Sequence, residues 1–210
     1  GSDTKGNKST ALGRGTLVAQ NFTSSTDSNN TAVGYFAGNA VTTGRLNTLI
    51  GALAGDATTT ANNVTAVGAS ALSANTTGAD ITAVGAAALA TNTTGASNTA
   101  VGYGALNANT TAANNTGIGA YALVANTTGT RMTSVGSRSG MQNTTGNYNA
   151  FVGYDAGESN TTGASNTFIG DSAGRETTTA SNNTAVGQSA LLANTTGTRN
   201  NAIGATALDA

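Results

Sequence analysis

The chain has 210 residues, enough for one ordinary domain, and a net charge of −1 with only 8% charged residues. So little charge excludes bulk electrostatic attraction to nucleic acid or acidic membranes, and no apolar run approaches the ~18 residues of a membrane span. The absence of His and Cys removes the commonest general base, thiolate chemistry and disulfides. We therefore expect no enzyme, no cofactor and no metal site.

The N-terminal segment precedes a regular repeat. Residues 1–8 are predicted to be a tail, and residues 9–29 a first coil around Leu12-Gly13. The interval from Gly13 to Gly34 is 21 residues, so this coil carries four extra residues, which we place in the polar stretch 20–29. Residues 30–210 are predicted to form one regular repeat domain.

A β-branched aliphatic residue followed by Gly recurs every 17 residues, in eleven copies without an insertion. We number the positions of a copy from Asn98, the first, to Asn114, the seventeenth. The aliphatic residue then occupies the fourth position and Gly the fifth. This predicted structural ladder begins with Val33, Gly34, Ile50, Gly51, Val67, Gly68, Val84, Gly85, Val101 and Gly102, and continues to Ile203-Gly204.

The composition of each copy favours a β-coil over a helix. Thr, Val, Asn and Gly are frequent and disfavour helix. The segment Thr-Ala-Val suits a short strand, whereas Asn-Thr-Thr-Gly suits a tight turn. Two strands and two turns per copy would stack on the next copy at about 4.8 Å. We predict an all-β fold, a parallel β-solenoid (β-roll or β-helix) of about 12 coils.

The third and ninth positions exchange volume between copies. Where the ninth is Leu, the third is small, as in Leu106 with Ala100. Where the ninth is Gly, the third is often large: Leu49 with Gly55, Phe151 with Gly157, and Phe168 with Gly174. Close packing explains this exchange if both positions share one space.

Strand alternation then predicts association between chains. The third and fourth positions point to opposite faces of a strand, and both are apolar. One narrow coil has one interior, so a second copy would supply the other cover. The candidate association face contains Leu49, Phe151 and Phe168, with the fourth-position face as the other option. Alternatively, a twist at the fifth-position glycine encloses both faces in one wide coil.

Three further surface features have competing interpretations. Asp155 and Asp171 could be paired as a catalytic or metal dyad, but their different repeat positions favour a surface salt cluster with Glu158, Arg175 and Glu176. The sixth-position tyrosines Tyr35, Tyr103 and Tyr154 are interpreted as filling gaps beside Gly, with sugar stacking as the alternative.

The thirteenth position is Thr in every complete copy. Such a row could face solvent and order water, which makes ice binding a rival function to turn chemistry. The candidate exposed Thr ladder contains Thr76, Thr93, Thr110 and Thr127.

The motif Asn-Thr-Ala-Val-Gly-Tyr-x-Ala-Leu, followed by Asn-Thr-Thr-Gly at a 17-residue period, resembles repeat arrays of phage and prophage tail fibres. It is less closely similar to the heads of trimeric autotransporter adhesins. Both resemblances imply homotrimers of stacked β-coils outside the cell, on a virion or cell surface. They imply a fibre shaft or a receptor-binding region. The implied partners are further copies of the same chain and a cell-surface glycan or receptor, without nucleic-acid binding or membrane insertion. The alternative to a fibre segment is a subunit of a self-assembling extracellular filament.

Overall fold

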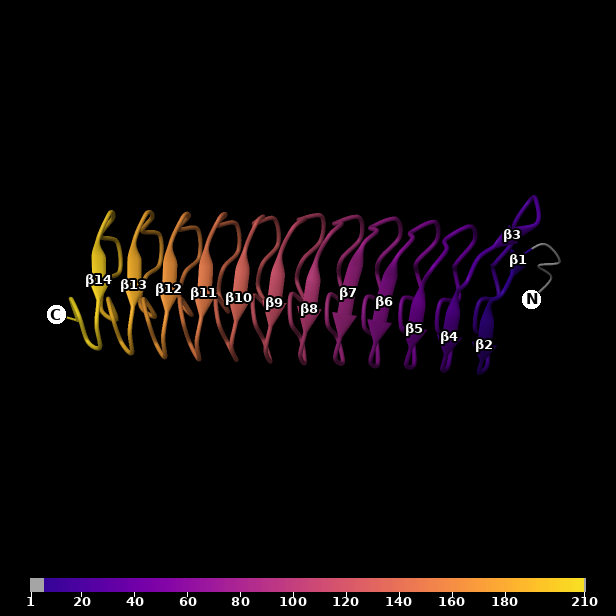
Figure 1. Ribbon diagram of the computed structural model, residues 1–210, viewed down its shortest axis with the longest axis horizontal. Helices are drawn as coiled ribbons and strands as arrows, with labels where there is room; N and C mark the ends of the chain where they lie inside the picture. The colour runs from indigo at the N-terminus through magenta and orange to yellow at the C-terminus, as the bar shows by residue number, and fades with distance from the viewer. Residues whose placement is uncertain (1–5, 210) are drawn as a thin grey trace.

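The computed structural model describes residues 6–209 as a straight rod of stacked coils, with the termini at opposite ends (Figure 1). Within these residues there is no helix. The strands are β1 (Gly6–Asn7), β2 (Thr10–Leu12), β3 (Thr26–Asp27), β4 (Thr31–Val33), β5 (Thr48–Ile50), β6 (Val64–Val67), β7 (Ile81–Val84), β8 (Thr99–Val101), β9 (Thr116–Ile118), β10 (Thr133–Val135), β11 (Ala150–Val152), β12 (Thr167–Ile169), β13 (Thr184–Val186) and β14 (Asn201–Ile203).

Twelve strands form one parallel sheet in sequence order from β2 to β14, so the predicted β-solenoid of 17-residue coils is confirmed, with about 11 turns. Equivalent positions stack directly: Val84 pairs with Val101, and Ala83 with Ala100. The fifth-position glycines also stack. A Cβ at Gly85 would lie 2.5 Å from the carbonyl oxygen of Gly102, so a side chain does not fit between the coils.

The four extra residues of the first coil leave the stacking intact, because β2 pairs with β4 in the register of the other coils, Leu12 beside Val33. The surplus chain leads into β3, which pairs with β1 in a separate two-stranded sheet. The expected tail 1–8 therefore holds a strand at Gly6–Asn7, and residues 1–5 lie outside the described residues.

Each regular coil contains one strand, so the expectation of two was wrong. The reason lies in the backbone after the fifth-position glycine, where the seventh, ninth and seventeenth positions all have positive φ. In the coil of Asn115, these are Tyr121 (φ 60°), Leu123 (φ 52°) and Arg131 (φ 57°). Residues in this left-handed region interrupt an extended segment. The far side of the coil is consequently built from turns.

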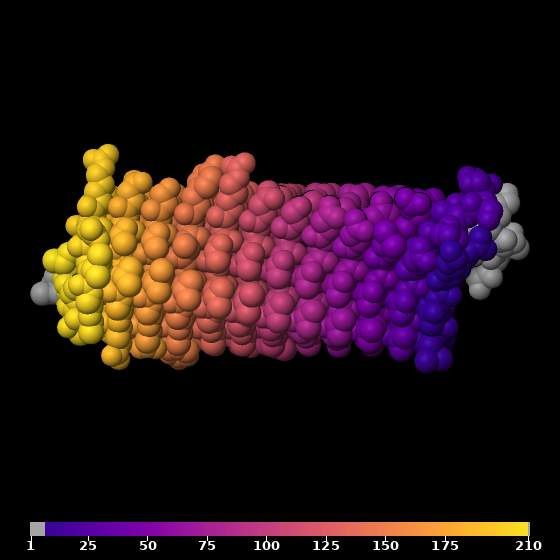
Figure 2. Space-filling model, in the orientation of Figure 1, coloured from indigo at the N-terminus to yellow at the C-terminus, as the bar shows by residue number. Residues whose placement is uncertain are grey.

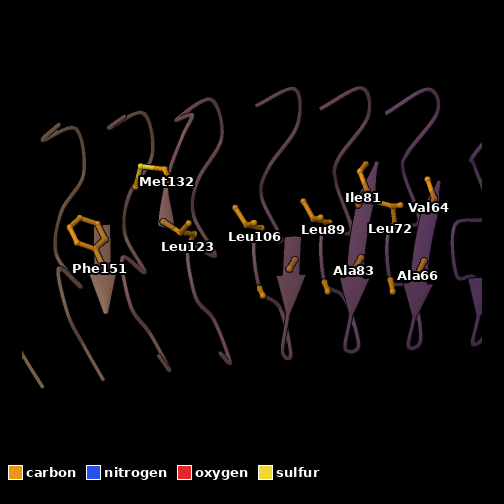
Figure 3. Close-up of a cluster of buried hydrophobic side chains, with 14 of the residues drawn as sticks. Val64, Ala66, Leu72, Ile81, Ala83, Leu89, Leu106, Leu123, Met132 and Phe151 are labelled. Atoms are coloured by element: carbon orange, nitrogen blue, oxygen red, sulfur yellow. The ribbon is translucent and has the colours of Figure 1, made fainter. Parts of the chain in front are cut away.

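The interior of the rod holds the third and ninth positions together, as the volume exchange predicted. Leu72, Leu89, Leu106 and Leu123 project into it from successive coils, and Phe151 takes their place further along (Figure 3). A Cβ at Gly157 would lie 2.7 Å from the Phe151 ring, and one at Gly174 would lie 2.6 Å from the Phe168 ring. The rings therefore occupy the space that leucines fill elsewhere.

Leu49, Phe151 and Phe168 are completely buried within the single chain. Their assignment to an association face was therefore wrong. The coil closes on the side of the third-position side chains, where the facing ninth-position glycines make room for them. The two phenylalanine rings stack on each other, with centroids 5.4 Å apart and planes at 17°.

Two rows of buried asparagine side chains satisfy the polar groups of the interior. At the first position, Asn98 donates from Nδ2 to the carbonyl of Ala112 (2.8 Å) and accepts from the backbone N–H of Asn115 (2.9 Å). At the twelfth position, Asn109 donates to the side-chain oxygen of Asn92 (2.8 Å). Since buried polar groups need partners, these amide ladders fix the axial register in addition to the sheet.

Candidate functional site

The outer face of the sheet carries the second and fourth positions, on either side of the buried third position. The fourth-position side chains form a continuous aliphatic row. Ile50, Ile118 and Ile169 in this row are 38%, 39% and 41% exposed. The sequence predicted that this face is covered; in the single chain it is open to solvent.

The second position runs beside this row and is Thr in ten of the twelve strands, with Ala150 and Asn201 as the exceptions. Neither row contains a charged residue in the strands β2 and β4 to β14. The side chains repeat at the strand spacing of about 4.8 Å along the rod and about 7 Å across it. The surface of the rod shows this regularity as parallel rows of side chains (Figure 2).

The predicted exposed Thr ladder is only half-exposed, and its hydroxyl groups are used within the rod. Thr76 donates from Oγ1 to the carbonyl of Thr93 (3.0 Å), and Thr93 donates to that of Thr110 (3.1 Å). Thr127 likewise donates to Thr144 (3.0 Å). The exposed row is instead the fourteenth position, for example Thr77 and Thr94. The thirteenth-position threonines therefore connect coils rather than present free hydroxyls.

A charged cluster lies on the surface between residues 138 and 176. Arg138 donates to Asp155 (2.9 Å) and to Glu158 (2.8 Å), which lie one coil further along. Arg175 pairs with Glu176 at 2.9 Å. Asp171 is exposed and makes no ion pair among the described residues. The partner of Asp155 is thus an arginine, which favours the salt-cluster interpretation over a carboxylate dyad.

Sequence reasoning missed Arg138, although the necessary pattern is present. Arg138 and Asp155 both occupy the seventh position, 17 residues apart, so stacking alone brings them together. Asp155 is 3% exposed, and its Oδ1 is buried without a hydrogen-bond partner. Burial raises the pKa of Asp155 above its ordinary value, and the charge of Glu158 raises it further, whereas Arg138 and Arg175 oppose the shift.

The sixth-position tyrosines lie on the outer edge of the rod next to the sheet. Tyr35, Tyr103 and Tyr154 are 50%, 55% and 51% exposed, so about half of each side chain faces solvent and is not used to fill a gap beside Gly. Tyr103 contacts Tyr121 of the next coil edge to face, with ring centroids 5.3 Å apart. The guanidinium of Arg138 lies 5.5 Å from the centre of the Tyr154 ring.

At the C-terminal end of the rod, the interior of the last coil opens into a depression lined by residues that include Leu191, Asn194 and Leu208. The residues from 6 to 209 bring no three potential metal-ligating side chains of Asp, Glu, His or Cys together. Nor do they include a helix that could span a bilayer.

The stacked coils, shared register and internal ladders define the chain as a parallel β-solenoid repeat protein. No protein-family model, curated protein or solved structure matches it.

Proposed function

We propose that the chain is a structural segment of an extracellular fibre, a shaft or receptor-binding region of a phage tail fibre or bacterial surface adhesin. In this proposal the rods pack side by side as a homotrimer. The observation that carries it is the aliphatic fourth-position row, which runs along the sheet from Leu12 to Ile203. Parallel sheets are usually covered on both faces, and here the chain itself covers one.

A second copy of the same chain is the partner that best fits as a cover for this aliphatic row. Continuous apolar surface on a soluble protein marks an interaction site, and this row matches the length of an identical rod. Symmetric packing of parallel copies would place equivalent coils at the same height, so each aliphatic side chain would meet its own equivalent. The number three comes from the resemblance of the repeat to trimeric fibres.

The test is the mass in solution of the wild type and of a variant with Val84→Asp and Val101→Asp. We expect a trimer that dissociates in the variant, because two buried, unpaired carboxylates per chain cost several kcal/mol. The far-ultraviolet circular dichroism should stay unchanged, since both side chains lie outside the coil. Sedimentation equilibrium provides the masses.

The control is Thr94→Asp, which places a carboxylate at an exposed position away from the sheet face and should leave the trimer intact. A wild type that sediments as a monomer at micromolar concentration, with its solenoid folded, would contradict lateral packing. Long threads seen by electron microscopy would favour a filament subunit in place of a discrete trimer.

The outer face also supports ice binding as a second candidate function. Its hydroxyl-bearing and aliphatic rows form a regular, uncharged lattice with spacings of about 4.8 and 7 Å, which suits an ordered layer of water. The relevant threonines would be those of the second position, such as Thr82 and Thr99, and not the thirteenth-position ladder. A monomer that shows thermal hysteresis, lost on Thr82→Lys and Thr99→Lys, would favour this candidate. A trimer without hysteresis would exclude it.

A further inference from the structure

The sixth and seventh positions carry a strip of large side chains along one edge of the rod. Each of five successive coils contributes one exposed or half-exposed large side chain: Tyr103, Tyr121, Arg138, Tyr154 and Asp171, while Asp155 beside Tyr154 is buried. These coils are stacked in register, so the strip extends roughly 20 Å at the usual strand spacing. We infer that this strip is a binding surface for an uncharged carbohydrate chain that lies along the rod axis.

The fold does not require these side chains. The coils at residues 64–97 have Ala69, Ser70, Ala86 and Ala87 at the same two positions. The backbone hydrogen bond at this edge is the same with small and with large residues. The N–H of Ala87 donates to Ala69 at 3.0 Å, and that of Tyr121 donates to Tyr103 at 2.9 Å. In a repeat protein, a run of large exposed residues where the backbone accepts alanine indicates a role outside folding.

The aromatic rings of the strip are available to a ligand. Tyr103, Tyr121 and Tyr154 are 55%, 43% and 51% exposed. The Tyr121 ring lies back over Gly104, where a Cβ would lie 3.4 Å from it, and so rests beside Tyr103. The three phenol groups form no hydrogen bond with any other residue in the described part of the chain. Each ring therefore offers an apolar face together with an unused hydroxyl group.

The charges of the strip favour an uncharged partner. Arg138 is already paired with Asp155 and Glu158, and its guanidinium also lies over the Tyr154 ring. Arg175 is paired with Glu176. The neighbourhood thus has four carboxylates and two guanidinium groups, and the excess negative charge repels anions. Because most of these charges are internally paired, a cationic peptide would find only Asp171 without an ion pair.

A sugar chain fits these properties. The negative face of an aromatic ring attracts the weakly positive C–H groups on the face of a sugar ring. The phenol hydroxyls and the exposed Asp171 carboxylate can orient the sugar hydroxyls by hydrogen bonds. The strip consists of sixth- and seventh-position side chains and includes none of the aliphatic fourth-position row, so its test does not require the homotrimer.

The test is affinity electrophoresis of the intact chain in gels that contain glycogen, dextran, galactomannan or xyloglucan. We expect at least one of these neutral polysaccharides to retard the wild type. The triple variant Tyr103→Ala, Tyr121→Ala and Tyr154→Ala should bind it at least tenfold more weakly. Alanine occurs naturally at both positions in other coils, so this variant should fold.

The matched control is Tyr35→Ala, which removes an equally exposed sixth-position tyrosine far from the strip and should bind like the wild type. The inference is overturned if no neutral polysaccharide retards the wild type, if only alginate or polylysine does, or if the triple variant binds unchanged. Equal losses in the control and the triple variant would also overturn it. A monomeric wild type that binds glycan would refute the homotrimer and leave the strip intact.

Discussion

The coils of residues 64–97 and those of residues 132–182 share one backbone but differ inside and outside. The first pair fills its interior with Leu72 and Leu89 and has alanine or serine at the sixth and seventh positions. The second group fills much of the same space with Phe151 and Phe168 and carries the charged cluster on its surface. Both regions nevertheless keep one strand per coil in the same register.

This difference shows which positions the backbone controls. The fifth-position glycine is constant because φ is near +135° and an added Cβ would collide with the backbone of the next coil. The interior constrains only the total volume of the side chains at the third and ninth positions. Leucine at the ninth position or phenylalanine at the third position is therefore equally acceptable. The outer edge accepts almost any residue, and it is there that the two regions have diverged most.

The largest expected loss of stability comes from substituting the fifth-position glycine, which both regions share. Gly68→Ala in the first region and Gly153→Ala in the second should each destabilise the rod by about 3 kcal/mol, from backbone strain and overpacking. A Cβ would lie 2.6 Å from the carbonyl group of Gly85 in one case and closer still to that of Gly170 in the other. Thermal unfolding followed by circular dichroism measures the loss.

Gly204→Ala is the control, because its φ is +123° but no atom lies within 4 Å of the added Cβ. It should cost less than either internal change, since only the backbone strain remains. A loss of stability at only one of Gly68 and Gly153 would show that the two regions do not share one backbone constraint.

The next largest effect on stability is expected from substitutions that convert the phenylalanine interior of the second region into the leucine interior of the first. Phe151→Ala should cost about 3–5 kcal/mol through the cavity that it leaves. Gly157→Leu alone should also destabilise the rod, because its Cβ would lie 2.7 Å from the Phe151 ring. The double variant rebuilds the Ala-and-Leu interior of the first region and should recover at least half of the summed loss.

Denaturant unfolding of both single variants and the double variant gives this coupling energy. The reverse exchange, Ala83→Phe with Leu89→Gly, is the matched control in the first region. Strictly additive losses in both coils would mean that the third and ninth positions do not share one space.

The smallest effect concerns the Asp155 carboxyl, which only the second region contains. Burial and Glu158 raise its pKa above the ordinary value of 3.8, against the opposing charges of Arg138 and Arg175, while Asp171 adds to the rise. A pKa that is higher in the folded state means that the folded chain binds the proton more tightly. Its stabilising contribution is fully present below pH 3.8 and is lost as the pH rises through the folded pKa.

Asp155→Asn should therefore remove this gain on acidification. The melting temperatures of wild type and variant, measured from about pH 3 to about pH 7, should differ in their slope over the acidic range. Asp80→Asn, at an exposed site of the first region, is measured alongside as the reference for removing a carboxylate outside the charged cluster. A wild type that loses more stability than the Asp155 variant on acidification would contradict the raised pKa.

Much of the architecture could be predicted from the sequence, because a stacked repeat turns spacing into contact. The 17-residue period predicted the register, the glycine row and the shared space of the third and ninth positions. It also contained the Arg138–Asp155 pair, because both residues occupy the seventh position, although the sequence prediction did not include Arg138. The homotrimer, the fibre function and the ligand stay predictions.

Only the tertiary structure decided which face of each strand is inside. Alternation separates the third position from the fourth but does not say which one the chain closes around. That choice depends on the corners, where Leu123, Tyr121 and Arg131 adopt positive φ. Such residues rarely take this conformation, so nothing local in the sequence marks them. Closure around the third position buried Phe151 and left the aliphatic fourth-position row facing outward, because one narrow coil has room for only one of the two faces.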